Sequence, residues 1–145
     1  MEIIMNSLES DAKVVIGERN NHMSIDENMY EIIDQSGALI NSGVIVLNNV
    51  PVFHEAREKF EQRFLNRPKR IETVDGFVAI RVMKPLEGDT YTILTQWDSE
   101  NSFRGWQQSK AYQLAHKNRG TKQGIDQQEN VLKGKTNYHV YQVGS

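Results

Sequence analysis

The residues that could do chemistry gather in one stretch of the chain, from Trp97 to His116, with the sequence WDSENSFRGWQQSKAYQLAH. Trp106 lies ten residues before His116 on a segment whose pattern predicts a helix. The chain has no cysteine, so a bound redox metal or haem would need an imidazole as its ligand. The four candidate ligands are His22, His54, His116 and His139, and of these only His116 has a setting suited to that role.

On one unbroken helix, Trp106 and His116 would point roughly 80° apart around the axis. A break near Ser109, which could cap the next helical turn, would let both side chains face one pocket. Tyr112 precedes His116 by four residues and would share its side of the helix. A neutral imidazole beside apolar side chains is a good ligand for haem iron. The alternative is that Trp106 and Phe103 are core residues and that His116 is a solvated residue at a helix end.

Asn48 is the second unusual residue, because it interrupts an apolar run, Val44 to Val50, that predicts a strand. A buried amide without a hydrogen-bond partner costs on the order of 1–3 kcal/mol. A position facing a pocket would let the amide donate to a ligand. Alternatively, Asn48 and Asn49 simply end the strand before Pro51, since asparagine is a common turn residue.

Composition and motifs exclude several classes of function. The 145 residues predict one domain, and a net charge of −2 gives no reason to expect nucleic acid or an anionic membrane as partner. The chain lacks an apolar run long enough to span a membrane and a basic, apolar leader, so we expect a cytoplasmic protein. No zinc-binding, dinucleotide-binding, phosphate-binding or hydrolase motif is present. Four basic residues flank His116 and form either a solvated face or contacts to an anionic ligand: Lys110, Lys117, Arg119 and Lys122.

The chain divides into residues 1–42, which predict a small β-rich attachment, and residues 43–145, which predict an α+β domain. In the first part, 13–18 predicts a strand and 19–22 a turn, while 29–35 is ambiguous between strand and helix. The second part predicts strands over 44–50, 76–83, 90–97 and 138–143, and helices over 52–64, 99–109 and 111–118. This β-α-β-β-α-β order is typical of a ferredoxin-like fold, with two helices on one face of an antiparallel sheet. The other face needs cover, from a second subunit or from the attachment.

From about Val44 onward, the sequence resembles the antibiotic-biosynthesis-monooxygenase superfamily, and within it the IsdG-type haem-degrading monooxygenases of Gram-positive bacteria. The segments VLNNVPV, RFLNR, ETVDGFVAIRVMKPLEGDTYTILTQW and FRGWQQSKAYQLAHK carry the likeness. The larger HmoB-type members also have an N-terminal β-rich piece, and YEIIDQSGALINSGVIVLNN is similar to their junction.

The resemblance implies a site of three residues, Asn48, Trp106 and His116, with Tyr112 beside them. It implies that His116 is the proximal ligand of haem iron, that Asn48 hydrogen-bonds on the distal side, and that Trp106 presses on the porphyrin. Haem would be both substrate and cofactor, and O₂ and electrons from an external reductase would be consumed as the ring opens and iron is released. Minimal members of the family form dimers, whereas the attachment could cover the open sheet face within one chain, so we expect a monomer.

Two other functions are compatible with the same fold. One is a cofactor-independent monooxygenase of the superfamily, in which the organic substrate itself activates O₂. The other is a non-enzymatic haem-binding or stress-signalling protein, although family members of that class lack the histidine that this chain retains as His116.

Overall fold

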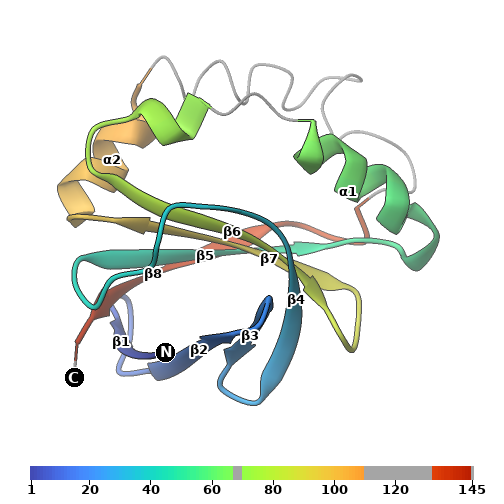
Figure 1. Ribbon diagram of the computed structural model, residues 1–145, viewed down its shortest axis with the longest axis horizontal. Coiled ribbons are helices and arrows are strands. Elements are labelled where there is room, and N and C mark those ends of the chain that lie inside the picture. Colours follow the sequence, from blue (N-terminus) through green and yellow to red (C-terminus); the bar gives the residue numbers. More distant parts are fainter. Residues whose placement is uncertain (67–69, 110–131, 145) are drawn as a thin grey trace.

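A computed structural model describes residues 1–66, 70–109 and 132–144 of the chain. Two helices cover one side of an antiparallel sheet and short strands from the N-terminus cover the other (Figure 1). The N-terminal strands are β1 (Glu2–Ser7), β2 (Lys13–Arg19), β3 (His22–Ile25) and β4 (Asn28–Ser36). The remaining elements are β5 (Val44–Pro51), η1 (His54–Ala56), α1 (Arg57–Leu65), η2 (Arg70–Thr73), β6 (Phe77–Pro85), β7 (Thr90–Trp97), α2 (Glu100–Gln107) and β8 (Asn137–Val143).

Strands β5 to β8 confirm the ferredoxin-like prediction. Their order across the sheet is β6-β7-β5-β8, every neighbouring pair is antiparallel, and both helices lie on the same face (Figure 1). The β-branched run at the start of β5 suits this central position, where the strand has a hydrogen-bonded neighbour on each side. The sheet therefore has one face toward the helices and one toward the N-terminal strands.

The N-terminal strands continue this same sheet and close it. β4 pairs with β6 and β1 pairs with β8, so that among the described residues the strands form a closed barrel. Closure removes the two edges at which unpaired backbone groups would otherwise be left. β2 and β3 are joined by Asn20 and Asn21, both with positive φ, as a tight hairpin requires. The turn predicted at 19–22 is confirmed, and the ambiguous segment 29–35 is strand.

The barrel interior is a core to which both parts of the chain contribute. Buried side chains from the N-terminal strands pack against buried side chains of the larger sheet, each worth roughly 1.5–3 kcal/mol when fully removed from water. The face that the sequence leaves in need of cover is thus covered within one chain. The N-terminal contributors are Ile3, Met5, Val14, Ile16, Met23 and Ile32, and those from the larger sheet are Ile45, Leu47, Ala79, Met83, Leu94 and Val143.

The first helix begins later than its apolar pattern predicts. The prediction starts a helix at Val52, but Val52 is fully buried and forms a β-bridge with Leu132, and regular α-helix begins at Arg57. The backbone groups here bond to distant segments instead, because the Val52 N–H donates to the Asp89 carbonyl at 2.8 Å and the Pro51 carbonyl accepts from the Lys133 N–H at 2.9 Å. The second helix ends at Gln107, slightly before the predicted Ser109, and the helical piece predicted over 111–118 lies outside the described residues.

Candidate functional site

Asn48 lies on the face of the sheet that the helices cover. Side chains along a strand alternate between faces, and Ile45 and Leu47 of β5 point into the barrel. Val46 and Val50 belong instead to the apolar clusters beneath the helices, and Asn48 shares their side. The strand runs on to Pro51, so the alternative in which Asn48 ends the strand is wrong.

Asn48 separates two apolar clusters on that face. Val46 packs on one side with the aromatic residues of α2, and Val50 packs on the other with the residues beneath α1. Across the sheet, Asn48 is opposite Ile93 of β7 and Tyr138 of β8. Asn48 is only half-buried, so its amide can donate to a group that enters between the two clusters.

The neighbouring asparagine has a different role. Asn49 is on the opposite face, where its amide donates to Asn137 Oδ1 at 3.1 Å and its carbonyl oxygen accepts from the Thr92 hydroxyl at 3.0 Å. These bonds tie β5 to both of its neighbours. Asn49 thus stabilises the pairing of the strands, whereas Asn48 faces the helices.

Helix α2 positions Trp106 above the end of β7. Ser99 caps the helix by accepting a hydrogen bond from the Ser102 backbone at 3.2 Å, as its residue type predicts. The Trp106 ring then packs on Trp97 with the ring centres 5.5 Å apart and on Phe103 with the centres 6.4 Å apart. Trp97 is fully buried and Trp106 half-buried, so the stack has an inner ring that belongs to the core and an outer ring at its margin.

Polar side chains of α2 reach Tyr138, the residue opposite Asn48. Gln107 Nε2 donates to the Tyr138 hydroxyl at 3.3 Å, and Arg104 Nη1 donates to Gln107 Oε1 at 3.1 Å. Hydrogen bonding from Gln107, and then from Arg104, lowers the pKa of the Tyr138 phenol below its usual value of 10. These contacts connect α2 with β8 next to Asn48.

The other predicted site residues are not placed by the structure. His116, Tyr112 and the basic set around His116 lie outside the described residues. His22 and His54 are exposed at the starts of β3 and η1, and His139 is exposed on β8 with Nδ1 3.8 Å from Glu9. Within residues 1–66, 70–109 and 132–144, no three carboxylate or imidazole side chains converge in a way that would hold a metal ion.

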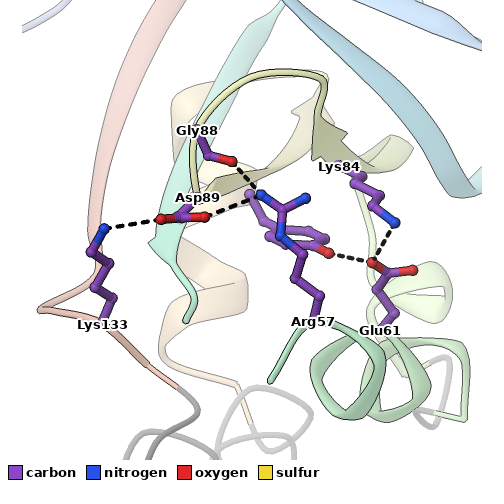
Figure 2. A network of polar contacts seen from close by, with 7 residues as sticks. Arg57, Glu61, Lys84, Gly88, Asp89 and Lys133 are labelled. Carbon is purple, nitrogen blue, oxygen red and sulfur yellow. Dashed lines mark hydrogen bonds and ion pairs between the residues drawn. The ribbon is translucent and has the colours of Figure 1, made fainter. Parts of the chain in front are cut away.

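A network of charges that sequence reasoning missed lies at the first residues of α1 (Figure 2). Arg57 donates to the Gly88 carbonyl and to Asp89, at 3.2 Å, and Lys133 Nζ donates to the other oxygen of Asp89 at 2.9 Å. The network ties α1 and the residues before β8 to the β6–β7 turn. No local sequence pattern predicts this network, because its residues come from segments that are far apart along the chain.

Glu61, one turn further along α1, holds a second set of polar contacts. It accepts a hydrogen bond from the fully buried Tyr91 and lies 3.2 Å from Lys84 Nζ. Burial, together with the bond to Glu61, raises the pKa of the Tyr91 phenol. Tyr91 therefore stays neutral and serves to fix α1 on the sheet.

Asp89 gives a test of the network through acid stability. Lys133 and Arg57 hold the pKa of Asp89 below 3.8, so its ionised form is favoured by folding. Its contribution is present above pH 3.8 and is lost as the pH falls through the lower pKa of the folded state. We expect Asp89→Asn to lower the melting temperature at pH 6. The difference in melting temperature between this variant and wild type should shrink as the pH falls below 3.8. A difference that stays constant down to full protonation would contradict this account.

Among the described residues, none of the helices has the length and the apolar content needed to cross a lipid bilayer. The described part of the candidate site consists of the Asn48 amide on the helix-covered sheet face, the Trp97–Trp106 pair on the same face, and Tyr138 with its polar partners. This is an α+β ferredoxin-like protein with mainly apolar clusters between the sheet and the helices.

Comparison with known proteins gives the family. The model of the antibiotic biosynthesis monooxygenase family matches residues 43–118, just over half of the chain. A heme-degrading monooxygenase of Bacillus mycoides (strain KBAB4) is 31% identical over 80 residues, which cover 53% of this chain and 74% of that protein. The chain belongs to the antibiotic biosynthesis monooxygenase family.

Solved structures extend the likeness to the N-terminal strands. A major regulator of staphylococcal pathogenesis matches with a TM-score of 0.78 at 16% identity, over 98% of this chain and 84% of that one. A heme-degrading enzyme from Listeria monocytogenes matches with a TM-score of 0.64 at 15% identity, over 97% of this chain and 83% of that one. At such identities the likeness is one of fold, and it includes the strands that close the barrel.

Proposed function

We propose that this protein is a haem-degrading monooxygenase, which binds haem as its substrate, opens the porphyrin ring with O₂ and electrons from an external donor, and releases iron. The observation that carries the proposal is the placement of Asn48 on the helix-covered face, between the apolar cluster that contains Trp97 and Trp106 and the apolar cluster beneath α1. A relative named for heme degradation, 31% identical to this chain, supports it.

The described residues suit a large flat apolar substrate. Such a molecule needs an apolar wall with few polar anchors, and the cluster of Val46, Trp97, Phe103 and Trp106 is such a wall. Trp106, at the outer edge of this cluster, would press on the porphyrin and help to hold it out of plane. Asn48 would donate a hydrogen bond to the reacting side of the bound haem.

His116 completes the proposed site. Its imidazole would bind the haem iron, and Tyr112 would contact the porphyrin. Haem, when bound this way, supplies the metal at which O₂ is activated. The support for these two roles is the match of the family model, which extends to residue 118 and so includes both positions.

We expect Asn48→Ala to bind haem with nearly unchanged affinity and to degrade it about ten- to a hundredfold more slowly, since one hydrogen bond to the reacting group is lost. The measurement is the rate of Soret bleaching with a chemical reductant and catalase present. Asn49→Ala is the matched control, because that amide braces the opposite face. It should lose stability but keep its rate per folded molecule. Equal rates in wild type and Asn48→Ala would remove Asn48 from the mechanism.

The fold by itself does not choose between an enzyme and a regulator, because the staphylococcal regulator shares the same architecture. A haem-carrying protein would bind haem without degrading it. A regulatory protein would not degrade haem, whether or not it bound it. A cofactor-independent monooxygenase would leave the Soret band of added haemin unchanged. We also propose a monomer, since the barrel-facing side of the sheet is buried by the chain's own N-terminal strands.

A further inference from the structure

Tyr138 marks the point at which the helix-facing side of the sheet opens to solvent. It is 45% exposed, whereas Val140, two residues further along the same face of β8, is 2% exposed. Tyr138 is also directly opposite Asn48 in the strand register. Anything held against Asn48 between sheet and helices therefore has Tyr138 at its solvent-exposed edge.

The hydroxyl oxygen of Tyr138 is an acceptor toward α2, so its O–H group can donate to another molecule. It accepts a hydrogen bond from Gln107, whose own carbonyl oxygen accepts from Arg104, so the phenol is polarised along a chain of donors. Phe103 packs edge-on against the Tyr138 ring with centres 6.1 Å apart, and the Arg104 guanidinium lies over Phe103, 5.1 Å from its centre. The ring and the cation are thus held in place by α2.

Two negative charges lie near this cluster: Glu9, which is close enough to oppose the lowering of the Tyr138 pKa, and Glu100. The Glu100 carboxylate is 3.3 Å from the Arg104 guanidinium, and both side chains are close to half exposed. An exposed pair of this kind contributes little to stability and exchanges readily for another anion. The Arg104 guanidinium can therefore donate some of its N–H groups to a ligand carboxylate at the solvent-exposed edge beside Tyr138.

Haem combines an apolar ring with two carboxylates on one edge, and the two parts need different surroundings. The aromatic wall around Trp106 suits the ring, and the donors at Tyr138 suit a carboxylate that remains near water. We propose that Tyr138 and Arg104, aligned by Gln107, bind a carboxylate of haem and thereby fix which edge of the porphyrin faces solvent. This inference rests on the proposed function and names the anchor of its substrate.

The test compares ferric haem with its dimethyl ester, which keeps the ring and iron but has no carboxylate. Binding is followed by quenching of tryptophan fluorescence, a readout that needs no turnover. We expect the wild-type protein to bind haem at least about tenfold more tightly than the ester. Tyr138→Phe and Arg104→Met should each weaken haem binding by about that factor and leave ester binding unchanged. Tyr141→Phe, on the barrel-facing side of the same strand, is the control and should alter neither affinity.

The other outcomes overturn either the carboxylate anchor or the proposed function. Equal affinity of the wild-type protein for haem and ester would overturn the carboxylate anchor and leave the proposed function standing. Equal loss of both ligands in Tyr138→Phe and Arg104→Met would also overturn it, because the side chains would then only shape the pocket. If the wild-type protein bound neither porphyrin, the proposed function itself would fail.

Discussion

Replacing His116 with alanine should lower the rate of haem degradation by a factor of at least about one hundred. The imidazole is the proposed bond between protein and iron, and the chain has no cysteine that could replace it. The variant should still fold, and its complex with ferric haem should show a displaced Soret band and weaker binding. Absorbance titration followed by single-turnover bleaching measures both effects.

Two controls distinguish loss of the ligand from a general defect. His139→Ala removes an exposed imidazole of β8 that lies near Glu9, and it should behave like wild type. Imidazole added to His116→Ala should restore part of the Soret band position, because it can occupy the vacated coordination position. Turnover at the wild-type rate in His116→Ala would contradict the assignment of this residue.

Replacing Trp97 with alanine should lower the free energy of unfolding by about 3–5 kcal/mol. Trp97 is fully buried at the end of β7 and touches Phe77, Phe103 and Trp106, with ring centres 5.9, 6.1 and 5.5 Å away. Its indole N–H donates to the Thr95 hydroxyl at 3.1 Å. The substitution leaves a cavity beneath α2 that the surrounding rings fill only in part. Urea unfolding followed by circular dichroism measures the change.

Trp106→Phe is the matched variant. Trp106 is only half-buried, so this change should cost no more than about 1 kcal/mol in stability. It should instead impair haem degradation, and NMR of the haem complex should show a flatter porphyrin. The pair of variants therefore separates the inner ring, which holds the fold, from the outer ring, which is proposed to act on the substrate. Trp97→Phe removes the same atoms as Trp106→Phe, and equal stability losses in these two variants would show that this distinction is wrong.

The sequence predicts best the elements whose signals are local. β7 begins and ends where its alternating pattern does, β5 and β8 differ from prediction by one residue at an end, and Ser99 caps α2 as its residue type indicates. These signals depend on side-chain alternation or on a single cap, both of which act within a few residues. The ferredoxin-like arrangement follows from their order.

Closure of the barrel could not be predicted in the same way. It depends on the pairing of β1 with β8, in which Asn6 is opposite Gln142, and on the pairing of β4 with β6. Nothing in a six-residue strand specifies a partner at the other end of the chain. The late beginning of α1 has a similar cause, since the bridge from Val52 to Leu132 is also a contact between distant segments.

The candidate site likewise combines residues that local sequence signals predict with contacts between distant segments. The sequence alone assigns Trp106 to a helix and Asn48 to a strand. It does not show that Asn48 faces the helices and Asn49 the opposite side, because that depends on how β5 pairs with its neighbours. The contact of Tyr138 with Gln107 joins residues of two elements that the sequence treats separately. Asp89, with its partners Arg57 and Lys133, is a further long-range set of this kind.

The most direct test of the central claim is an anaerobic titration of the wild-type protein with haemin, followed by addition of ascorbate and air. We expect the Soret band to saturate at about one haem per chain and then to bleach with catalase present, as iron becomes available to a chelator. Stable binding without bleaching, with ascorbate and with a protein reductase alike, would contradict the account and indicate a haem carrier. Absence of any Soret change would contradict it more completely and favour a haem-free monooxygenase.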